Sequence, residues 1–214
     1  MKKTISLLLT LVVIIGIFLG ANGVNAENTD SYSKKHFKYV ITPKSPEWLN
    51  YNVLELKDKL NISISDAESM DTESLLSVVL DYPFLGDIYA FDNPLNAIDF
   101  LAEQFNGLKV LLKRENLKDK LINSYINSSN RIIKLKDNQK IDNEEVYKIK
   151  YRQTLLTYPA VCSKLSKIEK NTIISKSKKA AAKIGTNPIQ ESDLFSITVL
   201  AAGDVIRTGT VYTP

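Results

Sequence analysis

The side chains that most often carry out catalysis or bind metals are rare in this sequence. It contains a single histidine, His36, and a single cysteine, Cys162. Metal sites and acid–base pairs usually draw on several such groups, and a nucleophilic cysteine needs a base within reach. We interpret Cys162, which lies beside Val161 and Leu165, as a small core residue; the alternatives are a nucleophile or half of a disulfide with another chain.

Carboxylates offer the remaining route to catalysis. A glycosidase needs two carboxyl groups at a defined separation, and the candidates here are Asp81, Asp87, Asp92 and Asp99. No pair among them has a separation that the sequence defines. We therefore expect a protein that is not an enzyme, with no catalytic residue, no metal ion and no cofactor.

Acidic and basic residues are segregated along the chain. Residues 61–108 hold nine acidic residues and no lysine or arginine, whereas residues 109–183 hold 19 basic and 7 acidic residues, a net charge of +12. Calcium is one interpretation of the acidic half. Its first four carboxylates lack the glycine and the terminal glutamate of an EF-hand loop; they are Asp66, Glu68, Asp71 and Glu73. The favoured interpretation is that the two halves face each other or water.

Two groups of side chains in the basic half are candidates for binding. The first is a row on one side of a predicted helix, Tyr147, Tyr151 and Tyr158. Such a row either stacks on sugar rings or covers the edge of a core with its hydroxyls in water. The second is a group of lysines in a basic run, Lys176, Lys178 and Lys179. These would contact anionic wall polymers or lipid headgroups, the alternative being a solvated helix face.

The N-terminal segment has the features of a secretory signal peptide. Lys2 and Lys3 precede an apolar run that ends at Leu19, and small residues before Glu27 suit a signal peptidase. Without cleavage the run would be a membrane anchor, but it is shorter than the roughly 18 to 20 residues that a bilayer needs. No cysteine follows the run, which argues against a lipoprotein. We expect a chain that is secreted or associated with the cell envelope, with no stable membrane span after cleavage.

The exported part is close to electrical balance. Without Lys2 and Lys3 it keeps 26 basic and 24 acidic residues, a net charge of +2. This overall charge by itself points to no polyanionic partner, and we expect no nucleic-acid partner. Residues 27–214 are long enough for one domain with a core of its own. One cysteine cannot form an intramolecular disulfide, so packing must stabilise this domain.

The chain divides into segments that differ in amino-acid composition. We predict a signal peptide at residues 1–26, a flexible leader at 27–45, a helical domain at 46–185 and a C-terminal tail at 186–214. Pro46 is expected to open a helix that carries an apolar face of Leu49, Val53, Leu56 and Leu60. Trp48 would cover the core edge, or else form an exposed platform. The tail is rich in β-branched residues, and we interpret it as a linker or a truncated strand.

Capping signals predict three short helices in the central stretch. Asp71 caps the first, which ends near Asp81 because a proline follows shortly after. Asn93 caps the second, which has proline at its first position, and Gly107 is expected to end it. Asn116 caps the third.

The basic half predicts two further helices. Residues 126–140 are polar and are expected to form a mobile connection. Asp142 then starts a helix that Pro159 ends. A last helix over residues 160–184 should kink or restart near Asn171, because its apolar stripes do not align on one straight helix.

A resemblance to exported proteins is carried by the run LLSVVLDYPFLGDIYAFDNPLNAIDFLAEQFNGLKVLLKRENLKDKLINSY and the ending TVYTP. These segments resemble the N-terminal helical region of an uncharacterised group of exported bacterial proteins. In longer members a segment similar to TVYTP leads into a domain whose Asn-Cys-His motif looks like a cysteine-hydrolase site. Neither Cys162 nor His36 matches that motif. The resemblance therefore implies export and a helical domain, and no activity.

The sequence as a whole predicts a mainly α protein, a compact bundle of short helices with a short β-prone C-terminal tail. The predicted role is a non-enzymatic interaction, with a polymer of the bacterial cell envelope or another protein as the partner. The alternative is an accessory or pro-region of a secreted hydrolase whose catalytic domain is missing from this chain.

Overall fold

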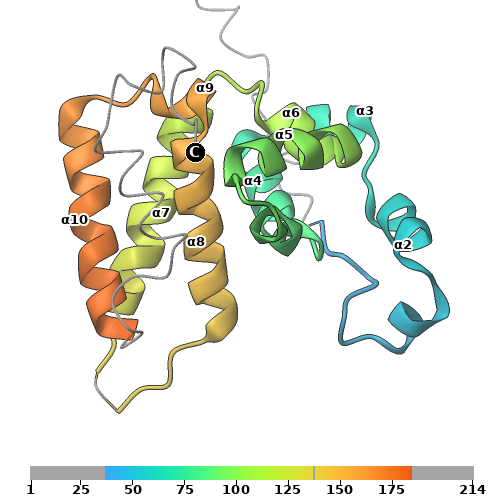
Figure 1. Ribbon diagram of the computed structural model, residues 1–214, viewed down its shortest axis with the longest axis horizontal. Helices are drawn as coiled ribbons and strands as arrows, with labels where there is room; N and C mark the ends of the chain where they lie inside the picture. Colours follow the sequence, from blue (N-terminus) through green and yellow to red (C-terminus); the bar gives the residue numbers. More distant parts are fainter. Residues whose placement is uncertain (1–36, 137, 185–214) are drawn as a thin grey trace, which may run out of the picture. The chain divides into compact units, whose positions relative to one another are not determined.

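The computed structural model describes residues 37–136 and 138–184. Every regular element within these residues is a helix, which confirms the prediction of a mainly α fold (Figure 1). The predictions for the signal peptide and for the tail at 186–214 concern residues outside this described part.

The described part begins with short elements, and its longest helices, α7, α8 and α10, lie in its second half. The first half holds the 3₁₀ turn η2 (Pro46–Asn50), α2 (Val53–Leu60), α3 (Ile64–Ser69), α4 (Thr72–Leu80), the 3₁₀ turn η3 (Leu85–Ala90), α5 (Pro94–Gln104) and α6 (Asn106–Leu111). The second half holds α7 (Leu117–Ile133), α8 (Asn143–Thr157), α9 (Pro159–Cys162) and α10 (Lys167–Ile184).

Apolar side chains from most of these elements form one buried cluster. Its largest fully buried members include Leu75, Phe105, Leu111, Leu121 and Tyr125. Burying one such side chain stabilises the fold by about 1.5 to 3 kcal/mol. The cluster extends from α2 to α10, so short helices with little stability of their own are held by shared packing.

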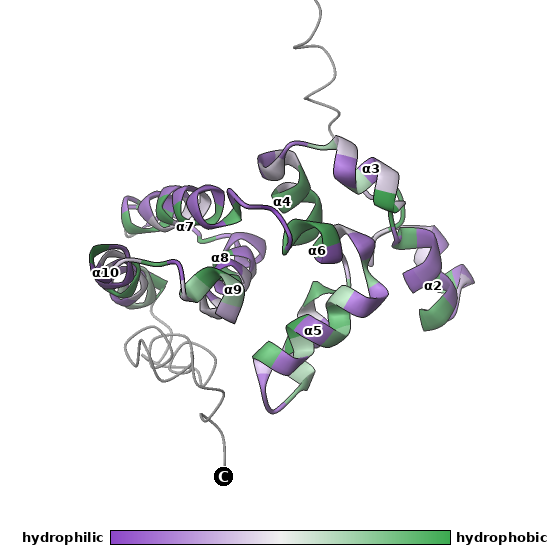
Figure 2. Cartoon of the chain, turned by 90° about the horizontal axis from the view of Figure 1, so that it is seen from above, coloured by the Kyte–Doolittle hydropathy of each residue, from purple (hydrophilic) through white to green (hydrophobic). Residues whose placement is uncertain are grey.

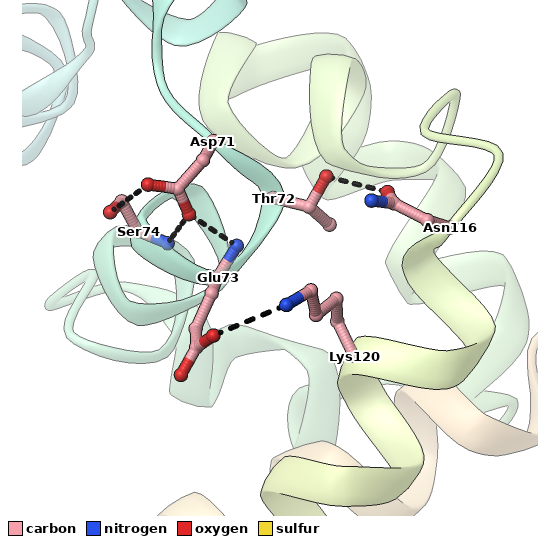
Figure 3. Close-up of polar contacts among 6 residues, drawn as sticks. All are labelled: Asp71, Thr72, Glu73, Ser74, Asn116 and Lys120. Atoms are coloured by element: carbon pink, nitrogen blue, oxygen red, sulfur yellow. Dashed lines mark hydrogen bonds and ion pairs between the residues drawn. The ribbon is translucent and has the colours of Figure 1, made fainter. Parts of the chain in front are cut away.

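Helix α4 begins and ends where its capping signals predict. The Asp71 carboxylate accepts hydrogen bonds from the backbone N–H groups of Glu73 and Ser74, at 2.9 and 2.8 Å (Figure 3). The Ser74 hydroxyl donates to the other carboxylate oxygen at 2.8 Å. These bonds satisfy donors that the first turn of a helix leaves without a partner.

Helix α5 also begins as predicted, but Gly107 does not end it. The Asn93 side chain accepts from the Leu95 backbone N–H at 2.9 Å, and the helix ends at Gln104. Gly107 lies inside the next helix, α6. A Cβ atom there would lie 2.4 Å from Cζ of the Phe105 ring, so the position needs glycine to make room for an aromatic side chain.

The helix predicted from Pro46 is wrong in its length, and only the second half of its predicted apolar face is buried. Asn52 interrupts it by forming a capping box with Glu55 at the start of α2. Leu56 and Leu60 are buried, whereas Leu49 and Val53 are 88% and 56% exposed and do not belong to the core. Trp48 stacks on Phe84 with ring centroids 5.4 Å apart, which fits the interpretation that it covers the core edge.

The packed domain reaches into the predicted leader. Tyr39 is only 6% exposed, and its hydroxyl donates to the Val78 carbonyl oxygen at 3.3 Å. Its ring also meets Tyr82, with centroids 5.9 Å apart. The domain therefore starts before residue 45.

The connection predicted at residues 126–140 is wrong for its first half. Helix α7 continues to Ile133, and Ser128, Ser129 and Ile132 on this part of it are buried. Small serine side chains leave room for neighbouring helices. Because serine is polar, the sequence alone does not indicate that these positions are buried.

The last predicted helix breaks at a different place. Residues 163–166 separate α9 from α10, and α10 runs unbroken through Asn171. Ser166 and Glu169 form a capping box, in which the Ser166 N–H donates to the Glu169 carboxylate at 2.6 Å and the Glu169 N–H donates to the Ser166 hydroxyl at 3.2 Å. This local start signal decides where α10 begins.

Helices α7, α8 and α10 run side by side (Figures 1 and 2). Gln153 of α8 links them, because its Nε2 donates to the Tyr125 hydroxyl of α7 at 3.0 Å and to the Ser177 hydroxyl of α10 at 2.7 Å. All three residues are buried. A buried polar contact of this kind orients helices that apolar packing alone would hold less specifically.

A substitution at Gly107 tests the packing against Phe105. The Phe105 ring is fully buried and stacks on Tyr82 with centroids 3.9 Å apart, so it cannot move away from an added methyl group. We expect Gly107→Ala to lower the free energy of unfolding by about 2 kcal/mol. Urea denaturation would measure this. Lys109→Ala, on the exposed side of the same helix, is the control and should change stability by less than about 0.5 kcal/mol.

Acid titration tests the contact between α7 and α10. The Lys118 ammonium donates to Glu169 at 2.8 Å, and this bond with those from Ser166 lowers the Glu169 pKa from its ordinary value of 4.5 to about 2. A carboxylate with a lowered pKa stabilises the fold above its unfolded pKa, and this stabilisation is lost as the pH falls toward the folded pKa. The stability gap between the native chain and Glu169→Gln should therefore be full above about pH 5 and close by about pH 2. A gap that stays constant on acidification would contradict this assignment.

Candidate functional site

An open, polar pocket of about 210 Å³ lies where α4, α7 and α8 meet. Helix α4 supplies Glu73 and α8 supplies Arg152. The remaining lining comes from one face of α7 and consists of Lys120, Asn123, Ser124, Asn127, Ser128 and Arg131. These positions recur every three or four residues, which places them along one side of a helix.

Arg152 is the most unusual residue of this pocket. Its side chain is only 8% exposed, and its Nε donates to the Ser124 hydroxyl oxygen at 2.8 Å. Its Nη1 is buried with no hydrogen-bond partner, and no carboxylate of residues 37–136 and 138–184 pairs with it. Burial lowers the Arg152 pKa, partly opposed by the nearby charge of Glu145. An arginine stays charged in proteins, so desolvation here is not offset by an acceptor for every donor.

Arg131 is held at the edge of the pocket by two neighbours. Its Nη2 donates to the Glu145 carboxylate at 2.6 Å and to the Ser128 hydroxyl at 3.0 Å. Burial alone would raise the Glu145 pKa, but hydrogen bonds from Arg131 and Ser128 lower it. Glu145 therefore stays ionised and fixes the position of one guanidinium group.

Lys120 and Glu73 close the pocket on the α4 side. The Lys120 ammonium lies 3.4 Å from the Glu73 carboxylate (Figure 3). Close by, the Thr72 hydroxyl donates to the Asn116 side-chain oxygen at 2.6 Å. Together these contacts tie the start of α4 to the first turns of α7.

The lining favours binding of an anion. Three cationic side chains and one carboxylate face the pocket, a net charge of +2 for its lining. Hydroxyl and amide groups add neutral donors, and the described lining contains no histidine or cysteine. Guanidinium groups bind carboxylate and phosphate oxygens with two parallel hydrogen bonds.

The predicted tyrosine row does not form a continuous exposed surface. Tyr147 is 55% exposed. Tyr151 stacks on Tyr89 with centroids 5.5 Å apart, and the Tyr158 hydroxyl donates to Asp99 at 2.7 Å. Burial and this bond raise the Tyr158 pKa to about 12. Two of the three tyrosines are thus engaged at the edge of the core.

The predicted lysines lie on α10, away from the pocket lining. Lys176 is half-buried and donates to the Asn130 side-chain oxygen, whereas Lys178 and Lys179 are exposed. Sequence reasoning therefore identified a basic surface but not the pocket. It missed the pocket because it assigned residues 126–140 to a connection, which cut the polar face of α7 in two.

The cysteine and the aspartates that could carry out chemistry lie outside this pocket. Cys162 is 2% exposed, and burial raises its thiol pKa, which fits the core interpretation. Asp81 pairs with Lys148 at 2.6 Å and Asp87 with Lys57 at 3.1 Å. In the described residues no group of three histidine, cysteine or acidic side chains could hold a metal ion. His36 lies outside the described part.

The acidic and basic halves of the chain do meet. Asp81 and Glu73 come from the acidic half, and their partners Lys148 and Lys120 come from the basic half. These pairs fit the interpretation that the halves face each other.

No helix of the described residues has the length and apolar content that crossing a membrane requires. No protein-family model, curated protein or solved structure matches this chain.

Stability measurements test whether Arg152 is kept for packing or for binding. Met fills a similar volume without a charge, so Arg152→Met should leave the free energy of unfolding unchanged or raise it by about 1 kcal/mol. Thermal and urea denaturation would measure this. Arg131→Met removes the ion pair with Glu145 and should cost up to about 1 kcal/mol. A loss above about 2 kcal/mol for Arg152→Met would show that the arginine supports the fold instead.

Proposed function

We propose that this chain is an exported, non-enzymatic helical protein that acts by binding at the bacterial cell envelope, and that the pocket around Arg152 is its contact site for an anionic group. The signal peptide expected at residues 1–26 supports export. The observation that carries the binding site is the buried guanidinium of Arg152, which has a donor without a partner and lines an open pocket.

The chemistry of the pocket supports binding over catalysis. Arginine and lysine side chains stabilise negative charge but are poor general bases at neutral pH. Glu73 is largely exposed and already faces Lys120, and the described residues place no histidine beside the hydroxyls of the lining. The described residues therefore do not assemble in this pocket the pair of nucleophile and base that acyl transfer requires.

An envelope polymer is a suitable partner because it carries many anionic groups. A weak site for one group gains affinity when several chains, or several contacts, engage the same polymer. The exposed Lys178 and Lys179 of α10 would add a long-range attraction that salt screens. The partner is thus expected to bind less well as ionic strength rises.

Binding of the full exported chain to isolated bacterial cell walls tests this proposal. We expect saturable binding that weakens with salt, and Arg152→Gln should weaken it about tenfold, since a hydrogen bond to a charged group contributes about 1.5 kcal/mol or more. The matched control is the double variant Lys178→Gln and Lys179→Gln, which removes charge from outside the pocket and should change affinity by less than about threefold.

Two outcomes would overturn the proposal. Wall binding that survives Arg152→Gln but disappears in the lysine double variant would place the contact on α10. Absence of wall binding, together with tight binding to a secreted hydrolase domain, would favour the alternative role as an accessory region.

A further inference from the structure

We propose that the group bound in this pocket is a phosphate, and that Glu73 is the resident partner of Lys120 that the phosphate displaces. The inference rests on the proposed function, because it names the ligand of the same site. It is drawn from the number and chemical type of the donors, from the charge of the lining and from the contact between Glu73 and Lys120.

The donors that line the pocket come from two helices. Arg152 comes from α8, whereas Arg131 and Lys120 come from opposite ends of one face of α7, with Ser124 and Asn127 between them. Arg152 Nε already donates to Ser124, so the Ser124 hydroxyl proton is left to point elsewhere. A planar carboxylate is satisfied by a single arginine fork, whereas the non-bridging oxygens of a tetrahedral phosphate, two in a diester and three in a monoester, are not confined to the plane of one such fork.

The charge of the lining also fits a phosphate. Its net charge of +2 includes Glu73, and Glu145 outside the lining already neutralises much of Arg131. Arg152 and Lys120 are then the cations with most to gain from a ligand. A phosphodiester carries one negative charge and a monoester up to two, which is the range that this lining can compensate.

The size of the pocket suits a small charged group. Pockets for drug-sized ligands usually have volumes of about 300 to 1,000 Å³, whereas this one has about 210 Å³ and is open to solvent. A phosphate with its two ester substituents directed outward meets that limit. The same opening would admit a phosphate that is part of a long polymer.

Glu73 makes the weakest ion pair around the pocket. It lies 3.4 Å from Lys120 and its side chain is 76% exposed, whereas Glu145 lies 2.6 Å from Arg131 and is 24% exposed. An exposed ion pair contributes little to stability because water screens it. A phosphate can therefore replace Glu73 as the ion-pair partner of Lys120 at a small cost in free energy. The Glu73 carboxylate then rotates toward the solvent.

Titration of the full chain tests both parts of this inference. The probes are inorganic phosphate, glycerophosphoglycerol as a soluble phosphodiester, sodium acetate as the carboxylate and phosphatidylglycerol vesicles as a lipid source. Calorimetry and amide chemical shifts would report binding. We expect saturable binding of a phosphate probe, little binding of acetate, a loss of about tenfold in Arg152→Gln, and a gain of about threefold in Glu73→Gln because Lys120 is released.

Two control variants separate a local effect from a change of net charge. Glu103→Gln removes one carboxylate from the exposed side of α5 and should leave phosphate affinity unchanged. Arg152→Lys keeps the charge but loses the planar fork, so its affinity should fall between those of the native chain and Arg152→Gln. Equal gains in Glu73→Gln and Glu103→Gln would overturn the displacement role of Glu73.

The outcomes distinguish this inference from the proposed function. Tighter binding of the diester than of inorganic phosphate or vesicles would assign a polymer linkage as the source; preference for vesicles would assign a lipid headgroup. Wall binding that depends on Arg152, with acetate bound as tightly as phosphate, would refute the phosphate assignment and leave the proposed function standing. Phosphate binding at Arg152 without any wall binding would support the site and refute the envelope role.

Discussion

The packing of α7 against several neighbours is the constraint on which the rest of the structure depends. This helix contacts α4, α8 and α10, and it buries Leu121 and Tyr125 completely. Short helices such as α4 have little stability in isolation, because nucleating a helix fixes several dihedral angles for few hydrogen bonds. A long helix with buried residues on several sides gives them a common surface.

Polar side chains then set the orientation of that packing. Gln153 holds Tyr125 and Ser177 together inside the three longer helices. The Lys118 contact with Glu169 joins α7 to the start of α10 from outside. Buried polar groups cost desolvation unless they are paired, so each satisfied pair excludes arrangements of the helices that would leave it unpaired.

Arg152 departs from this rule. It lies on the same helix as Gln153 and is nearly as buried, yet one of its terminal nitrogens has no acceptor among the described residues. Cores rarely keep a charged group in that condition, since replacing it by an apolar side chain is often neutral or stabilising. The open polar pocket beside it gives a reason to retain the charge, because a ligand oxygen would supply the missing acceptor. The fold is thus a scaffold on which the proposed anion site would cost stability and confer binding.

Local signals in the sequence determined the helix starts at α4, α5 and α8, since an Asp or Asn cap acts on backbone groups two or three residues away. They also determined the mainly helical class. Tertiary structure decided the rest. Gly107 is needed by the Phe105 ring and not by a helix end, and Ser128 and Ser129 are buried because other helices approach them. Glu73 and Arg152, which are nearly eighty residues apart in the sequence, line the same pocket. No local sequence pattern predicts this proximity, since only the packing of α4, α7 and α8 brings these side chains together.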